Sequence, residues 1–307
     1  MQEKNLWRQL GKTVLFGTII GVSGLYFAGL LLIIFPAFFM ISSVRDKLLP
    51  AMGAMAISSF LVGIFTDIQI GIFLFMCFSP MVLIFHYCVV SEKDYRFTII
   101  LMAFVLLLSF LAIDLGQTNA MEDFNYKEQI ETMIDQQIKS LSEGLTSLEI
   151  SRLDETLREA YKFTFMILPA ILIIGSIFIS YYNYIIAGRS LFKEGILIKH
   201  PPIFSALKLN RFILVPMIVS LFAVLYLKYT NSEIYEAVSM NVILIFGFFL
   251  AINGMATISF YLEKLKVPRF LRGLSYILIV FIKPLLIAAA FVGLSDLIFD
   301  FRKIGVA

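Results

Sequence analysis

The feature of this sequence that most limits its fold is a succession of apolar stretches along its whole length. Crossing the hydrocarbon core of a bilayer takes about 20 apolar residues as a helix, and nine stretches come close to or exceed that length. They are Gln9–Phe27, Ala28–Ser43, Pro50–Thr66, Gln69–Val90, Phe97–Leu115, Phe163–Ala187, Phe212–Leu227, Val238–Leu262 and Ser275–Gly293. Hydrophobic residues make up 60% of the 307 residues, which is more than a soluble globule of this size can bury. The sequence therefore predicts an all-α polytopic membrane protein with about nine transmembrane helices in contact with the lipid bilayer.

The basic residues orient these stretches. With nine spans and a cytoplasmic N-terminus, the cytoplasmic segments carry 16 Lys and Arg residues and the outer segments carry 6. This bias is the one expected of short cytoplasmic loops. Arg302 and Lys303 would then lie outside, unless a break near Pro284 turns the last stretch into a re-entrant hairpin. We predict a multi-pass protein of the cell membrane with its N-terminus in the cytosol, and the side of the C-terminus stays open.

The chain divides after the sixth stretch. Residues 1–187 contain six stretches and one long polar insert, and residues 188–307 contain the other three. The insert, residues 116–162, holds ten Asp and Glu against five Lys and Arg. The predicted organisation is therefore a six-span half that carries an acidic extracytoplasmic insert, followed by a three-span half.

The insert has the pattern of an amphipathic helix. Its apolar residues recur at three- and four-residue intervals from Ile130 to Leu148. Gly144 is expected to break this helix, and Thr146 with Glu149 has the form of a capping box at the start of a second helix. Two interpretations stay open: a solvated helical hairpin that ties spans together, or a lid over an outward-facing pocket.

Signatures of catalysis and of metal binding are missing from the sequence. The two histidines, His86 and His200, belong to no metal-ligand spacing, and no nucleophile elbow or phosphate-binding loop occurs. A net charge of +3, without a basic block interleaved with aromatic residues, argues against nucleic acid as a partner. We predict a non-enzymatic protein that needs no cofactor or metal.

Polar and aromatic residues gather at the outer ends of the first, third and fifth spans. If these ends converge, they form the mouth of a pocket for a small ligand, whose orientation a few polar groups would fix. The residues are Tyr26, Asp67, Gln69, Asp114, Gln117 and Asn119. The alternative is that they are ordinary interfacial tyrosines and helix caps.

Three polar residues, Asn241, Asn253 and Lys283, fall inside the last two apolar stretches. Asn253 and Lys283 lie at similar depths, about 13.5 and 12 Å from the inner boundary at a rise of about 1.5 Å per residue. An ammonium at mid-bilayer costs about 2.5–3.5 kcal/mol, so Lys283 should face protein or water. We expect the side-chain oxygen of Asn253 to contact Lys283, and the alternative is a lysine that extends to the interface.

The first span contains two glycines, Gly17 and Gly21, four residues apart. Small residues at this spacing let a second helix approach closely. We assign the pair to a contact with a partner helix, with packing inside the protein as the alternative.

The last third of the chain resembles a known family. The resemblance rests on Asn241-Val-Ile-Leu, Asn253-Gly254, Val267-Pro268-Arg269 and the ending GLSDLIFDFRK, Gly293 to Lys303. These segments resemble the YybS-like family of bacterial predicted membrane proteins, a domain family of unknown function. That family is similar in fold to the S components of energy-coupling-factor transporters, six-helix membrane proteins that capture small substrates.

This resemblance implies a function for the first six spans. They would form an S-component-like unit whose outer turns make the pocket, and Gly17 and Gly21 would dock a transmembrane coupling protein with its ATPases. The leading prediction is capture of a small molecule for uptake, neutral or cationic because the acidic insert sets the field over the entrance. The alternative is a non-transporting scaffold or regulator of envelope or division proteins, because shape-determining membrane proteins of the MreD type resemble the same fold.

Overall fold

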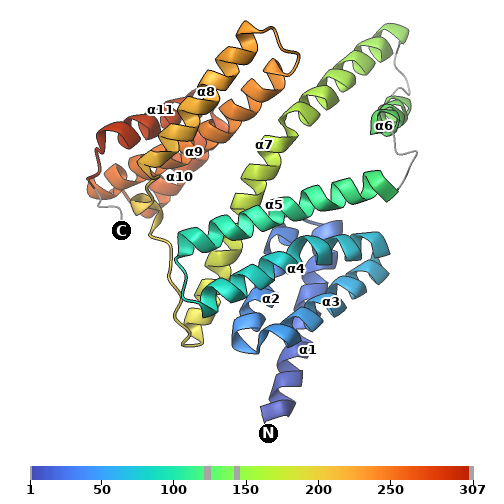
Figure 1. Cartoon of the computed structure of the whole chain (residues 1–307), viewed down its shortest axis with the longest axis vertical. Coiled ribbons are helices and arrows are strands. Elements are labelled where there is room, and N and C mark those ends of the chain that lie inside the picture. Colours follow the sequence, from blue (N-terminus) through green and yellow to red (C-terminus); the bar gives the residue numbers. More distant parts are fainter. Residues whose placement is uncertain (1, 121–125, 142–145, 304–307) are drawn as a thin grey trace. The chain divides into compact units, whose positions relative to one another are not determined.

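The computed structural model describes residues 2–120, 126–141 and 146–303, and their side chains over 8–113, 131–141, 146 and 148–303 (Figure 1). These residues form eleven α-helices and two short 3₁₀ helices, without a strand. Contacts divide the chain into two compact units. Unit 1 consists of Met1–Phe124 and Gly175–Pro201, and unit 2 of Asn125–Ile174 and Pro202–Ala307. The predicted division at residue 187 differs from these bounds and stays a prediction.

Unit 1 is a bundle of six helical segments. They are α1 (Gln2–Tyr26), α2 (Leu30–Arg45), α3 (Leu48–Phe65), α4 (Ile68–Val90), α5 (Tyr95–Ala120) and the second part of α7 (Ser147–Lys193). Helix α4 packs against α2, α3 and α5, and α1 packs against α2 and α3. The core consists of large side chains, among which Phe35, Phe39, Met55, Met81 and Phe85 are fully buried.

Unit 2 contains the remaining helices. They are α6 (Tyr126–Leu141), the first part of α7, η1 (Phe204–Ala206), η2 (Arg211–Ile213), α8 (Leu214–Tyr229), α9 (Tyr235–Lys264), α10 (Arg269–Phe281) and α11 (Lys283–Phe299). Helix α9 is the centre of the C-terminal part, because α8, α10, α11 and η1 all pack against it. The ninth apolar stretch is not one straight span, since α10 and α11 are bent by 105° at their junction.

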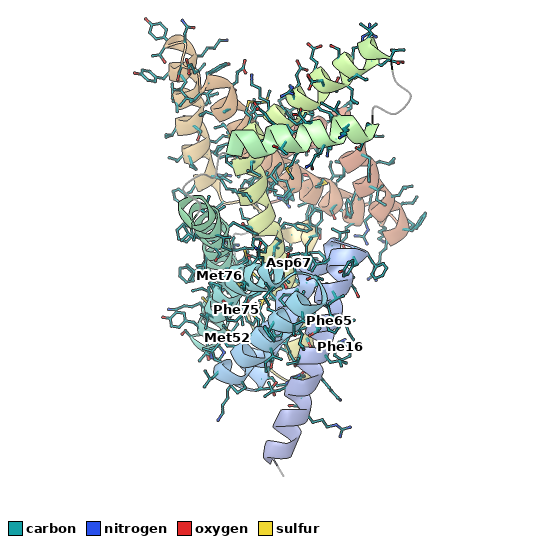
Figure 2. All side chains as sticks on the ribbon, turned by 90° about the vertical axis from the view of Figure 1, so that its right-hand side faces the viewer. Phe16, Met52, Phe65, Asp67, Phe75 and Met76 are labelled. Atoms are coloured by element: carbon teal, nitrogen blue, oxygen red, sulfur yellow. The ribbon has the colours of Figure 1, made fainter. Side chains whose placement is uncertain are left out.

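The helices are suited to a membrane. Six helices in the described part of the chain are long and apolar enough to cross a membrane. The number is seven if α10 and α11 count as one broken span. Large apolar side chains project outward from unit 1, as Figure 2 shows for Phe16, Phe65 and Met76, which are 51%, 62% and 55% exposed. The structure confirms an all-α polytopic membrane protein. It gives fewer certain spans than nine, because α1 is not among the candidate spans, α2 has only 16 residues and α10–α11 is bent.

The predicted amphipathic helix of the insert is present as α6. Ile134 on its apolar face is 3% exposed, and Asp135 forms an ion pair of 3.4 Å with Arg158 of α7. Half of the predicted capping box is present, because Glu149 accepts hydrogen bonds from the backbone and from the hydroxyl of Thr146. The predicted break at Gly144 lies outside the described residues.

Candidate functional site

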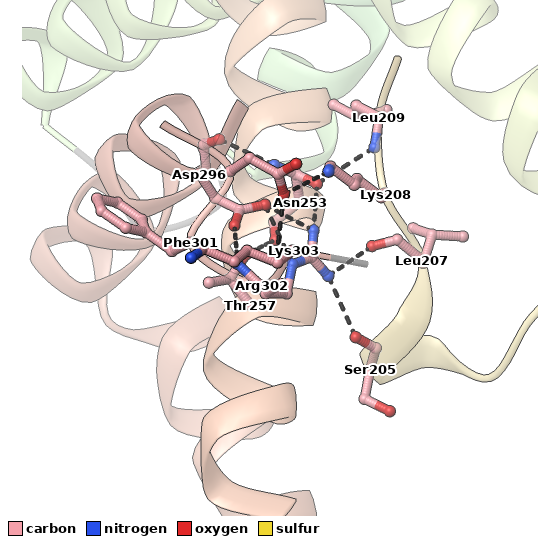
Figure 3. Close-up of polar contacts among 12 residues, drawn as sticks. Ser205, Leu207, Lys208, Leu209, Asn253, Thr257, Asp296, Phe301, Arg302 and Lys303 are labelled. Atoms are coloured by element: carbon pink, nitrogen blue, oxygen red, sulfur yellow. Dashed lines mark hydrogen bonds and ion pairs between the residues drawn. The ribbon is translucent and has the colours of Figure 1, made fainter. Parts of the chain in front are cut away.

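The densest buried polar cluster of unit 2 surrounds the Arg302 guanidinium (Figure 3). The side chains of Arg302 and Asp296 are both 0% exposed, and their charged groups lie 2.8 Å apart. Asn253 of α9 is also completely buried beside them. Ionisable groups at membrane depth are expensive and commonly mark functional positions, so this cluster is the first candidate site.

All five N–H groups of Arg302 have acceptors. Nε donates to Asp296, and Nη2 donates to Asp296 and to the side-chain oxygen of Asn253. Nη1 donates to the backbone oxygens of Ser205, at 3.2 Å, and of Leu207, at 2.7 Å. A guanidinium offers five donors in a fixed fork, so this one is saturated. The cluster therefore joins three chain segments and leaves Arg302 no donor for a ligand.

Close helix packing brings these residues together. Helices α9 and α11 cross where Gly254 meets Gly293, and a Cβ atom on either glycine would overlap backbone atoms of the other helix. Asn253 donates to the backbone oxygen of Gly293 at this crossing. After α11, Asp300 adopts a left-handed conformation with φ of 54°, which turns the chain back so that Arg302 reaches Asp296.

The expected contact of Asn253 with Lys283 is corrected by this geometry. The side-chain oxygen of Asn253 accepts from Arg302, at 2.9 Å, and from the backbone of Leu209, at 3.3 Å. Lys283 is the exposed first residue of α11, directly after the bend. The depth estimate assumed a straight last span, and the bend at Ile282 removes that premise. Sequence reasoning missed the contact between Asp296 and Arg302: both residues belong to the ending that resembles the family, and Arg302 was considered only for the charge distribution.

The side chain of Asn241 forms hydrogen bonds with two backbone groups of α7. Its side-chain nitrogen donates to the backbone oxygen of Met166, and its side-chain oxygen accepts from the backbone nitrogen of Ala170, both at 2.7 Å. A regular α-helix would join these two backbone groups to each other. They flank Pro169, which lacks an N–H group and disturbs the ladder. The predicted intramembrane polar residue thus satisfies two backbone groups of a neighbouring helix.

A second polar site lies inside unit 1. Ser176, Ser180 and Asn183 are 1%, 0% and 0% exposed and share one face of α7, three or four residues apart. Ser180 contacts the sulfur of Met81 at 3.8 Å, and Asn183 donates to the backbone oxygen of Ile33. The Oγ atom of Ser176 and the Oδ1 atom of Asn183 have no hydrogen-bond partner among the described residues. We call Ser176, Ser180 and Asn183 the polar stripe.

The outer turns of the first and third spans meet. The Tyr26 hydroxyl donates to the backbone oxygen of Phe65, at 3.2 Å. Asp67, labelled in Figure 2, caps α4 by accepting from the backbone nitrogen of Gln69. Three of the predicted mouth residues thus lie at one place, where Asp67 acts as a helix cap. The other three are Asp114, Gln117 and Asn119, whose side chains lie outside the described residues.

Gly17 and Gly21 face the interior of unit 1. A Cβ atom at Gly17 would lie 2.6 Å from the ring of Phe39 and 2.7 Å from the Ser58 hydroxyl, and one at Gly21 would lie 2.6 Å from Val62. This face of α1 is therefore occupied by α2 and α3. The assignment of the pair to a partner helix is corrected to packing inside unit 1, because the sequence spacing does not show which way the face points.

Each unit also contains a group of charged residues. In unit 1 a cavity of 270 Å³ is lined by Glu92, Lys93, Tyr184 and Lys199 among others, and the Tyr184 hydroxyl donates to the Lys199 backbone. In unit 2 Lys208 is paired with Asp300, and Arg211 lies 3.8 Å from the same carboxylate. The hydrogen bond from Lys208 lowers the pKa of Asp300, and the charges of Lys208 and Arg211 add to this effect. Asp300 is therefore ionised at neutral pH.

The fold and the buried polar groups define a helical multi-pass membrane protein. A family model described as "Predicted membrane protein (DUF2232)" matches residues 14–297, which include most of both units. The chain belongs to this family of predicted membrane proteins. No curated protein and no solved structure matches it.

Proposed function

We propose that this protein is a non-enzymatic substrate-capture subunit of the cell membrane, which binds a small neutral or cationic molecule for uptake. Unit 1, with six helical segments, would be the capture unit, as the resemblance to S components implies. A separate transmembrane coupling protein with ATPases would supply the energy. It would dock on a surface other than the one bearing Gly17 and Gly21, since that surface is packed inside unit 1.

The observation that carries the proposal is the polar stripe. A buried polar atom without a hydrogen-bond partner destabilises the folded protein by about 1–3 kcal/mol, and by more where water is excluded. Ser176 Oγ and Asn183 Oδ1 are two such atoms on one helix face. Bound ligand groups that donate hydrogen bonds would satisfy them. Asn183 already uses its amide nitrogen on Ile33 and Ile179, so it offers the ligand only an acceptor. This favours a neutral or cationic donor over an anion.

Thermal unfolding of the purified protein in the presence of a panel of small molecules tests the proposal. We expect at least one neutral or cationic donor to raise the melting temperature, and the Ser176→Ala variant to lose most of this rise. Ser43→Ala is the matched control, because Ser43 is equally buried but its hydroxyl already donates to the Met40 backbone oxygen. A panel in which only anions bind, or equal losses in both variants, would contradict the proposal.

The second candidate is a membrane scaffold or regulator without transport. It is favoured by α8, an apolar candidate span that packs against α9 without a fully buried residue and so leaves most of its surface for lipid or another membrane protein. Co-purification of envelope or division proteins, lost when exposed residues of α8 such as Phe222 are changed to Ala, would support it. Under substrate capture the same changes would leave ligand binding intact.

A further inference from the structure

Both ends of the α10–α11 pair lie at the same end of α9. Helix α10 begins at Arg269, five residues after α9 ends at Lys264. The chain after α11 returns to this end, because the Tyr261 hydroxyl donates to the backbone oxygen of Phe301, at 3.2 Å. With the bend of 105° between α10 and α11, the pair enters and leaves on one side. It has the form of a re-entrant hairpin and not of a ninth crossing.

Helix α10 is held against α9 by polar contacts. Arg272 forms an ion pair of 3.2 Å with Glu263, and the Tyr276 hydroxyl donates to Ser259, at 2.6 Å. These residues lie in the last two turns of α9, the end that the charge distribution predicts to be cytoplasmic. The hairpin therefore starts at the cytoplasmic face.

Residues 203–211, which we call the strap, also lie at this end of α9. The strap holds η1 and extended backbone, and its Leu209 backbone nitrogen donates to Asn253 in the middle of α9. Irregular backbone at membrane depth is tolerated only where it is buried in protein or lines a water-filled cavity. Here the C-terminal residues cover it: Arg302 binds the carbonyl groups of Ser205 and Leu207, and Asp300 binds Lys208 (Figure 3).

We propose that residues 300–303 are a cytoplasmic latch that holds the strap against α9, with α10–α11 as a re-entrant hairpin, and that release of the latch opens the strap as a gate. The C-terminal residues are then in the cytosol. Arg302 and Lys303 join the cytoplasmic basic residues, which raises the bias to 18 against 6. The proposal rests on contacts within unit 2 and does not depend on ligand capture by unit 1.

Cysteine labelling tests the topology. Cys77 and Cys88, both buried, are first changed to Ala, and single cysteines are then introduced as Lys303→Cys and Lys264→Cys. A membrane-impermeant maleimide should label both sites in inside-out vesicles and neither in intact cells. Labelling of Lys303→Cys in intact cells, with Lys264→Cys still protected, would place the two ends on opposite sides and overturn the proposal.

The rate of labelling at Ser205→Cys tests the latch. Ser205 is 6% exposed, so a cysteine there should react slowly in the closed state. Adding Arg302→Met should speed the reaction about tenfold or more through local opening. Lys303→Met is the control, because this exposed neighbour contributes only its backbone to the latch.

A milder variant keeps the test decisive if Arg302→Met does not fold. Asp300→Asn weakens the pair with Lys208 and leaves Arg302 and Asp296 in place. It should speed labelling of Ser205→Cys about two- to threefold, because a partly exposed ion pair contributes little to stability. Equal rates in the parent protein, Asp300→Asn and Lys303→Met would show that residues 300–303 do not hold the strap.

Discussion

The Arg302 cluster of unit 2 and the polar stripe of unit 1 bury polar groups in different ways. In unit 2 the Arg302 guanidinium has an acceptor for every N–H group, and Asn241 fits between two backbone groups of α7. In unit 1 the polar stripe leaves Ser176 Oγ and Asn183 Oδ1 without partners among the residues that the structure describes. Saturated networks specify one arrangement of chain segments, whereas unsatisfied groups favour binding of something else. Under the proposed function, a ligand would bind at the polar stripe, whereas the chain itself fills the Arg302 cluster. The contrast concerns these two clusters, because Arg272 Nε of unit 2 also has no partner among the described residues.

The largest expected effect comes from breaking the buried ion pair. Arg302→Met leaves Asp296 buried and uncompensated, which typically costs about 3–5 kcal/mol. We expect a loss of this order in the free energy of unfolding, measured by denaturant titration in detergent. Lys303→Met should change little. If both variants unfold alike, the cluster does not hold unit 2 together.

Asn241 gives the next largest effect. In Asn241→Leu the backbone groups of Met166 and Ala170 lose both partners, at about 1–3 kcal/mol for each group left unsatisfied. Asn241→Asp should cost at least as much, because an ionised carboxylate would face the Met166 backbone oxygen to which Asn241 donates. Ser239→Ala, at a neighbouring half-buried position, is the control. If Asn241→Leu is as stable as the parent protein, the backbone groups of Met166 and Ala170 must find partners within α7.

Glycine substitutions compare the packing of the units. Gly254→Ala places a methyl group against rigid backbone of α11, whereas Gly17→Ala meets the ring and hydroxyl of side chains that can move. Overpacking costs about 1–3 kcal/mol, and the loss should be larger for Gly254→Ala. Gly247→Ala has open space and should be neutral or slightly stabilising. A Gly17→Ala loss that exceeds that of Gly254→Ala would reverse the comparison.

In the polar stripe, we expect a substitution to leave stability unchanged or to raise it, in contrast to the losses predicted above. Without ligand, Ser176→Ala removes a buried group that has no partner, so the melting temperature should stay level or rise by the equivalent of about 1 kcal/mol. Ser180→Ala removes a hydroxyl that contacts Met81 and should not stabilise. A clear loss of stability in Ser176→Ala would mean that this hydroxyl is satisfied inside the protein.

The smallest effect is the pH dependence of the latch. The pKa of Asp300 lies below its ordinary value of 3.8, so its ion pair stabilises the folded state above that pH. This contribution should disappear as the pH falls through the lowered pKa of the folded state. Asp300→Asn should lack that part of the pH dependence, measured as melting temperature against pH. Identical acid profiles for both proteins would exclude Asp300 from the latch.

Much of the fold could be predicted from local sequence, because helices in a bilayer follow from apolar length and α6 from its periodicity. The hydrogen bond from the Thr146 backbone to Glu149 also followed from local pattern. A break near Pro284 was one of two interpretations of the last stretch, and the bend of 105° between α10 and α11 decides for it.

The candidate sites were harder to predict. Arg302 finds its partners at Ser205 and Leu207, about a hundred residues earlier, where spacing carries no signal. The direction in which Gly17 and Gly21 point depends on the rotation of α1, which the spacing of small residues does not determine.

The most direct test of the contrast between the units is native mass spectrometry of the protein released from its membrane. We predict that the parent protein carries a small molecule, that a variant with Ser176→Ala and Asn183→Leu arrives without it, and that Asp300→Asn retains it. An empty parent protein, or the same bound mass in all three, would contradict the view that the polar stripe of unit 1 is built to hold a ligand.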